Sequence, residues 1–163
     1  MPEPAARVVV IGAGNELMTD DGVGVHAVRR LRQTCQDPRV AFVEGGTALA
    51  DALDLVPDGA DVVVVDAAEG GGEPGSVYRL GLSDVASPRG VSLHERSLPE
   101  VFAAARVGGA RFGEVVVLGV EPATVAVGEG LSEALEARLD AVCDAARREI
   151  ARRAKEEHPA SSH

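Results

Sequence analysis

The sequence predicts an α/β fold: a single three-layer domain with a mostly parallel, twisted five-stranded sheet, one antiparallel strand, and helices on both faces. Two observations predict this class. Short valine-rich runs such as "DVVVVDA" are typical of strands that are buried on both faces of a parallel sheet. Helical patterns lie between these runs and supply the crossover connections that parallel strands need.

The elements follow in a regular order along the chain. Parallel strands are predicted at residues 7–13, 40–44, 61–67 and 114–120. Helices are predicted at residues 22–34, 47–56, 97–107 and 131–154, because apolar residues recur there every three or four positions. The segment "GSVYRLGL", residues 75–82, follows the third strand too closely for a helical crossover, so we expect it to pair antiparallel at a sheet edge. We expect one domain over residues 1–163, with a frayed polar tail at 155–163.

Composition excludes several classes of partner. A net charge of −10 and an aromatic content of 2% argue against a nucleic-acid partner, which needs basic and stacking side chains. The N-terminus lacks a secretory signal and no apolar run is long enough to cross a bilayer, so we expect a cytoplasmic protein with no membrane partner. Cys35 and Cys143 have no CxxC spacing, which argues against a structural zinc site. The oligomeric state stays open, with a monomer included.

Candidate chemistry gathers where the parallel strands end. Asp20 and Asp21 follow the first strand, Glu44 ends the second, Asp66 ends the third, and His94 lies in a later loop. In open sheets of this kind, ligands bind beyond the carboxyl ends of the strands. Two carboxylates and an imidazole at such an edge suit divalent Zn, Mn, Fe or Ni. We expect the ligand side chains to lie outside the hydrophobic core.

Each of these residues also has a purely structural interpretation. Asp20 or Asp21 fits a helix cap, a role that contributes ~1 kcal/mol. Asp66 fits a turn after its strand, Glu44 a solvated side chain, and His94 a surface histidine. The convergence of the set at one sheet edge, rather than any single member, favours a site.

A dinucleotide site is the main alternative for the loop after the first strand. Gly12 and Gly14 match the start of the fingerprint, and Glu44 stands where a ribose-binding acid is found. However, Leu17 occupies the place of the third glycine, which normally lets the helix pack closely on the strand. The two aspartates of this loop would also repel a pyrophosphate. The mismatch disfavours a dinucleotide.

The motifs, taken in order, resemble those of a known family. The blocks "VVVIGAGNELMTDDGVGVHAVRRL", "VEGGTA", "VVVVDAAEGGGEPGSVYRL", "VSLHE" and "VVVLGVEP" are similar to the successive motifs of the nickel-iron hydrogenase maturation endopeptidases. The similarity extends from about Val8 to Ile150. Each block alone is weak, whereas the ordered set is specific.

The resemblance implies an activity and a ligand set. It implies an endopeptidase that removes the C-terminal extension of a [NiFe] hydrogenase large-subunit precursor after nickel insertion. The metal-binding positions of the family fall on Asp21, Asp66 and His94, and the two aspartates are also the candidate catalytic residues. Some relatives carry Glu at the first of these positions, so Asp21 has a shorter reach.

The loop after the second strand is the candidate substrate-binding segment. It consists of Glu44, Gly45, Gly46 and Thr47. Two glycines permit a close approach of substrate to the backbone. In relatives an aspartate often precedes the glycine pair, and Glu44 is one methylene longer.

Two mechanisms and one other function are compatible with these residues. The metal that activates the water is nickel supplied by the substrate, with Zn or Cd as substitutes in vitro, or else an aspartate acts as general base in an aspartic-type mechanism. A metallochaperone or nickel-sensing module that binds metal without cutting would use the same three ligands.

Overall fold

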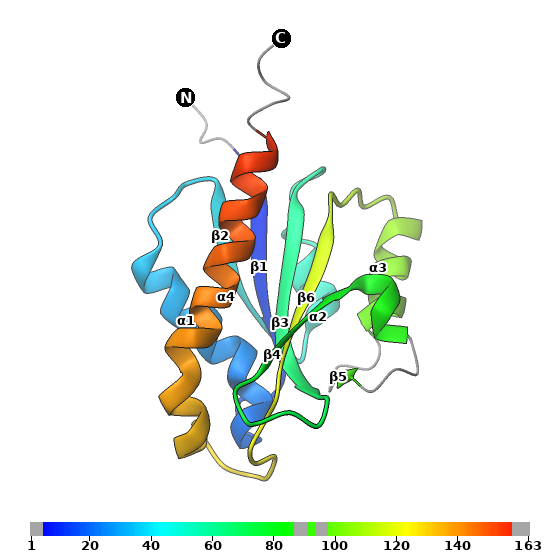
Figure 1. Ribbon diagram of the computed structural model, residues 1–163. Coiled ribbons are helices and arrows are strands. Elements are labelled where there is room, and N and C mark those ends of the chain that lie inside the picture. Colours follow the sequence, from blue (N-terminus) through cyan, green and yellow to red (C-terminus); the bar gives the residue numbers. More distant parts are fainter. Residues whose placement is uncertain (1–4, 87–90, 94–97, 158–163) are drawn as a thin grey trace.

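A central sheet lies between two layers of helices in the computed structural model, which describes residues 5–86, 91–93 and 98–157 (Figure 1). The strands are β1 (Val8–Ala13), β2 (Val40–Gly46), β3 (Asp61–Glu69), β4 (Val77–Gly81), β5 (Ser92–Leu93) and β6 (Val115–Val120). The order across the sheet is β2-β1-β3-β6-β4. The predicted α/β class is confirmed.

Strand directions follow from the connections. β1 pairs in parallel with β2 and β3, and β3 pairs in parallel with β6. β4 pairs antiparallel with β6 at the sheet edge, as the short connection after the third strand predicts. The two-residue β5 pairs antiparallel with the end of β3 and extends the predicted five strands to six. Two residues are too few to carry an alternation pattern, so the sequence does not reveal this strand.

The described residues form four α-helices, which cover the two faces of the sheet. They are α1 (Val23–Thr34), α2 (Leu49–Leu53), α3 (Leu98–Val107) and α4 (Glu133–Glu157). α1 and α4 lie on one face, and α2 and α3 lie on the other (Figure 1). α2 is shorter than the predicted 47–56, and α4 continues as far as Glu157. The described part of the chain also contains two 3₁₀ helices, η1 (Thr19–Gly22) and η2 (Leu82–Ala86).

The valine runs are continuous because both faces of the sheet are covered. Val8 and Val10 of β1 pack toward α1 and α4, whereas Val9 and Ile11 pack toward α2 and α3. β3 divides its valines in the same alternating way. Successive side chains of a strand point to opposite faces, so only a doubly covered sheet needs an apolar residue at every position.

A glycine in the first turn of α1 allows this helix to pack directly on the sheet. A Cβ atom on Gly24 would overlap the carbonyl oxygens of Val65 and Ala13, and a Cβ atom on Gly12 would overlap the carbonyl of Gly24. The close approach of helix and strand is therefore present without a glycine at position 17. The glycine that permits this close approach, Gly24, lies further along the chain than position 17, because a longer loop precedes the helix.

At the end of the sheet opposite the candidate site, an ion-pair network holds α4 against the strands. Arg153 is buried and lies 2.7 Å from a carboxylate oxygen of Glu149. Its guanidinium also lies 3.6 Å from Asp61 and 3.4 Å from Glu114, which stand at the starts of β3 and β6. A buried cation is tolerated only with such partners. The network anchors the C-terminal half of α4 far from the candidate site.

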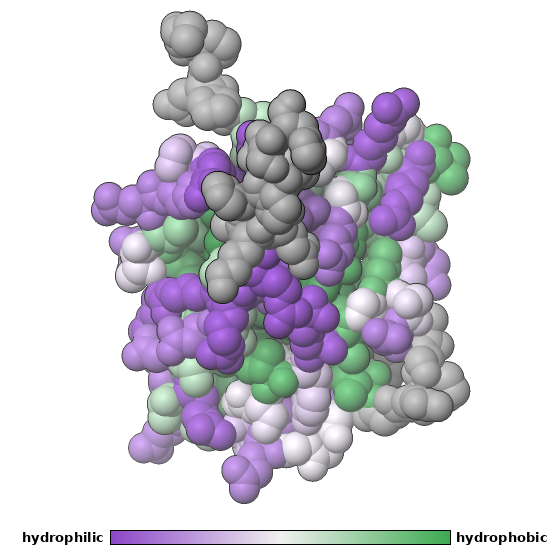
Figure 2. Space-filling model, turned by 45° about the horizontal axis from the view of Figure 1, so that its top comes forward, coloured by the Kyte–Doolittle hydropathy of each residue, from purple (hydrophilic) through white to green (hydrophobic). Residues whose placement is uncertain are grey.

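Figure 2 shows the molecule with the end that carries the termini tipped toward the viewer; much of this face is hydrophilic, and hydrophobic side chains show between the hydrophilic ones. Within the described ranges, no helix is both long enough and apolar enough to span a bilayer.

Candidate functional site

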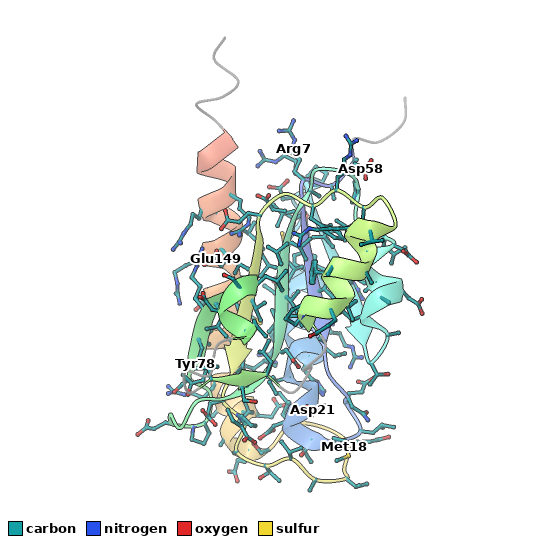
Figure 3. All side chains as sticks on the ribbon, turned by 90° about the vertical axis from the view of Figure 1, so that its right-hand side faces the viewer. Arg7, Met18, Asp21, Asp58, Tyr78 and Glu149 are labelled. Atoms are coloured by element: carbon teal, nitrogen blue, oxygen red, sulfur yellow. The ribbon has the colours of Figure 1, made fainter. Side chains whose placement is uncertain are left out.

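Asp21, Asp66 and the segment from Glu44 to Thr47 lie at the end of the molecule where β1, β3 and β6 finish. Figure 3 shows Asp21 and Met18 at this end, with Arg7 and Asp58 at the opposite end. Three loops meet here, at residues 14–22, 70–76 and 121–132. This is the edge that parallel α/β sheets use for ligands.

Asp21 and Asp66 both lie close to Gly14. The main-chain N–H of Asn15 donates to Asp21 Oδ2 at 2.8 Å, so the loop itself orients this half-buried carboxylate. A Cβ atom on Gly14 would overlap the carbonyl oxygen of Asp21 and would come within 3.3 Å of Asp66 Oδ1. Gly14 also has a φ of 112°, which favours glycine. The structure thus brings together two of the three predicted ligands.

The burial of Asp66 differs from the expectation for a residue outside the core. Asp66 is fully buried in β3, between Val65 and Ala67, and its Oδ1 accepts the N–H of Ala67 at 2.8 Å. The physical reason is that β3 lies in the centre of the sheet and continues for three residues beyond the aspartate. Asp21 is therefore the more accessible of the two carboxylates.

Asp20 has a structural role that differs from helix capping. Its carboxylate is fully buried and accepts the N–H groups of Ala123 and Thr124, each at 2.9 Å, through Oδ2. The N–H of Ser132 donates to Oδ1 and its hydroxyl to Oδ2, both at 2.7 Å. The N-cap of α1 is Gly22, without a side-chain cap bond. Asp20 thus joins the loop after β1 to the loop between β6 and α4.

Thr19 strengthens the junction of the two loops. Its N–H donates to the carbonyl of Gly128 at 2.9 Å, and its hydroxyl oxygen accepts the N–H of Ala126 at 3.1 Å. Thr19 has a φ of 50°, and the described ranges contain no other non-glycine residue with positive φ. For a β-branched residue this conformation costs of the order of 1–3 kcal/mol, so it persists only where its surroundings impose it. The hydrogen bonds to the second loop are those surroundings.

A cleft of about 270 Å³ opens beside the aspartates. The loop after β1 and the end of β2 form its walls, with Gly14, Asn15, Glu16, Leu17, Val25, Glu44, Gly46 and Thr47 as lining residues. Three of the four predicted substrate-binding residues are in this set. The cleft adjoins Asp21 because Asn15 both lines it and donates to that carboxylate.

Glu44 is an ion-pair partner as well as a wall of the cleft. Its carboxylate oxygens lie 2.7 Å from the guanidinium groups of Arg29 and Arg32 on α1. Hydrogen bonds from these two arginines hold the pKa of Glu44 below its ordinary value. Arg29 also pairs with Glu16 at 3.1 Å. This carboxylate is engaged by α1 and is not presented as a ribose acceptor.

The two glycines after Glu44 differ in their surroundings. Gly45 is buried as the extra residue of a bulge against β1, and a Cβ atom there would come within 2.9 Å of the side chain of Ile11. Gly46 has a φ of 54° and lines the cleft, and a Cβ atom there would make only an ordinary contact, 3.8 Å from the carbonyl oxygen of Gly14. A change at Gly45 therefore tests packing, and only a change at Gly46 tests the cleft.

The third predicted ligand, His94, lies outside the described residues. The described residue before it, Leu93, pairs with Ala68, two positions beyond Asp66. Within residues 5–86, 91–93 and 98–157, no group of three or more His, Cys, Asp or Glu side chains is arranged to hold a metal ion. Of the predicted ligand set, Asp21 and Asp66 are the members that lie within these ranges.

Comparison with known proteins identifies the family. A family model described as hydrogenase maturation protease matches residues 25–149. The chain belongs to the hydrogenase maturation protease family. It is 31% identical over 147 residues to the hydrogenase expression/formation protein HupD of Rhodobacter capsulatus, covering 86% of this chain and 70% of that protein. It is also 31% identical over 125 residues to HupD of Rhizobium leguminosarum bv. viciae, covering 74% and 62%.

The fold agrees with that of this protease family. The hydrogenase maturating endopeptidase HybD from E. coli superimposes with a TM-score of 0.71 and 28% sequence identity, covering 88% of this chain and 93% of that chain. The chain spans 62% of the length of the second HupD. The family resemblance inferred from the ordered motifs is confirmed.

Glu121 is a structural residue at the same end of the sheet that the sequence interpretation did not single out. It directly follows β6 and is buried, and its Oε1 accepts the hydroxyl of Tyr78 at 2.5 Å and the N–H of Gly70 at 2.8 Å. Cβ atoms on Gly70 or Gly72 would crowd the Tyr78 ring and hydroxyl, which explains two of the glycines in the run "EGGGEPG". An acid directly after a buried strand is the signal that marks Glu121.

Replacing Gly46 with leucine is expected to slow peptide cleavage by about tenfold or more, because the side chain would fill space beside the reacting groups. The change also costs about 1–2 kcal/mol of folding free energy, since an L-residue is strained at positive φ. Gly59→Leu is the matched control, because Gly59 has a φ of 84°, open space around it and a position at the other end of the sheet. Equal cleavage rates in the two variants would contradict a role of Gly46 in the substrate cleft.

Proposed function

We propose that this protein is the endopeptidase that removes the C-terminal extension of a [NiFe] hydrogenase large-subunit precursor after nickel insertion. The observation that carries the proposal is the placement of Asp21 and Asp66 around Gly14 at the edge of a cleft, in a chain of the hydrogenase maturation protease family. The sequence contains no HExxH motif, the pair of histidines with which one class of metalloproteases holds its own zinc.

Nickel is part of the substrate in this proposal. Asp21, Asp66 and His94 contact the nickel that the precursor presents, and Zn or Cd takes the same place in vitro. Oxygen and nitrogen donors with open positions suit these ions. Cutting then depends on a loaded precursor, because only the loaded form supplies the group that these side chains bind.

The chemistry assigns different tasks to the two carboxylates. Hydrolysis needs an activated water and a polarised carbonyl; the water oxygen bonds to the carbonyl carbon, and the C–N bond then breaks. Asp21 is the half-buried carboxylate next to the cleft, so it takes the proton of the water and returns it to the leaving amine. Asp66 is fully buried, so its role in this proposal is to hold the nickel and not to exchange a proton with water.

The test compares nickel-loaded and nickel-free precursor as substrates of the purified protein. Intact mass measurement is expected to show one cut near the C-terminus of the loaded precursor and no cut in the nickel-free one. A protein that binds the loaded precursor without shortening it would be a metallochaperone or sensor. Equal processing of both forms, or digestion of casein, would overturn the requirement for nickel.

A further inference from the structure

Exposed hydrophobic side chains gather beside the cleft. Among the residues that the structure describes, five large hydrophobic side chains are markedly exposed. Three of them, Leu17 (55%), Val125 (41%) and Val127 (87%), belong to the two loops that Asp20 joins, and we name them the rim patch. Isolated exposed apolar residues are ordinary on protein surfaces, whereas clusters mark interaction sites.

Main-chain hydrogen bonds hold the two loops of the rim patch together. The N–H of Gly128 donates to the carbonyl of Leu17 at 2.9 Å, and Met18 and Gly128 form a parallel β-bridge. Val127 directly precedes Gly128, so its backbone lies beside that of Leu17. The buried carboxylate of Asp20 and the strained Thr19 fix the same junction. The apolar side chains are therefore presented on a preorganised platform, which lowers the entropy cost of binding.

The rim patch is continuous with the cleft. Leu17 is a member of both, since it lines the cleft and is more than half exposed. Leu17 is also two residues from Asn15, whose N–H orients Asp21. A polypeptide that binds in the cleft to be cut would therefore lie against Leu17. The occupant that this continuity favours is thus the protein substrate itself.

We propose that the rim patch docks an apolar surface of the protein that is cleaved, and so contributes to substrate binding rather than to the chemical step. This inference rests on the proposed function for the identity of the partner. Such docking explains why two valine side chains are exposed next to a polar site. Because the reacting carboxylates are separate residues, loss of the patch raises KM and leaves kcat close to wild type.

The experiment uses the double variant Val125→Ser/Val127→Ser, with Val107→Ser as the control. Val107 is 90% exposed at the end of α3, which leads back to the start of β6 at the opposite end of the sheet. Steady-state cleavage of the nickel-loaded precursor is expected to show a KM about tenfold higher in the double variant, with kcat within about twofold of wild type. Val107→Ser is expected to behave as wild type.

Binding measured without cleavage separates this inference from the proposed function. In the Asp21→Asn background, calorimetry with the loaded precursor is expected to show an affinity about tenfold lower for the double variant. Unchanged KM and affinity in the double variant would overturn the docking role while leaving the protease assignment intact. Precursor that is bound but never cut by the wild type would overturn the protease assignment instead. A change of sedimentation coefficient with unchanged precursor affinity would make the patch a contact between copies of this chain and would overturn the inference.

Discussion

Asp21→Asn is expected to reduce cleavage of the nickel-loaded precursor by at least about a hundredfold, the range that a lost general base or charged ligand produces. The amide retains the shape of the side chain and an oxygen that can accept the Asn15 N–H. It loses the negative charge and the capacity to take a proton from water. Because Asp21 is half-buried and lies in the short 3₁₀ helix η1, outside the hydrophobic core, the unfolding midpoint should stay within about 3 °C of wild type.

Asp58→Asn is the matched control for this prediction. Asp58 is an exposed aspartate at the opposite end of the molecule (Figure 3). The same change of charge there should leave cleavage unaltered, which excludes an effect of net charge on substrate encounter. Cleavage is followed by intact mass, and metal affinity by calorimetry with Zn or Cd. Wild-type cleavage in the Asp21 variant would remove this residue from the mechanism.

The sheet was predictable because its signals are local. Valine at four successive positions before Asp66 identifies a strand covered on both faces, and the short connection before residue 77 determines an antiparallel edge strand. These features depend on neighbours in sequence and on the fixed period of a strand. The carboxyl ends of parallel strands then had to share one edge, which placed Asp21 and Asp66 together.

The different roles of Asp20 and Asp21 could not be predicted in the same way. The two residues are chemically identical neighbours, and the groups that distinguish them lie more than a hundred positions away, at Ala123 to Ser132. The role of Gly24 could not be predicted either, because a glycine is required there by the close contact with Val65 of β3. The ion pairs of Glu44 with Arg29 and Arg32 also depend on how α1 lies beside β2. Tertiary contacts decided all three roles.

Asp20→Asn is expected to lower the free energy of unfolding by about 3 kcal/mol, because a buried acceptor of charged hydrogen bonds is replaced by a group with one acceptor and one donor. The donors divide as one N–H to Oδ1, and two N–H groups and a hydroxyl to Oδ2. Whichever way the amide is turned, its NH₂ group faces at least one main-chain N–H. The carboxylate also lies at the start of α4, where the helix dipole favours an anion.

The consequence for activity follows from the loops that Asp20 joins. Without the Asp20 carboxylate, the loop of residues 121–132 is no longer held against the loop of residues 14–22, and Thr19 loses the contacts that impose its strained conformation. Asp21 is two residues after Thr19, so its position changes as well. Cleavage measured well below the unfolding midpoint should therefore also fall, and the midpoint should drop by roughly 10 °C. Asp21→Asn gives the opposite pair of results, with activity lost and the midpoint retained. An Asp20→Asn protein with wild-type midpoint and wild-type KM would show that the buried carboxylate does not hold the two loops in place.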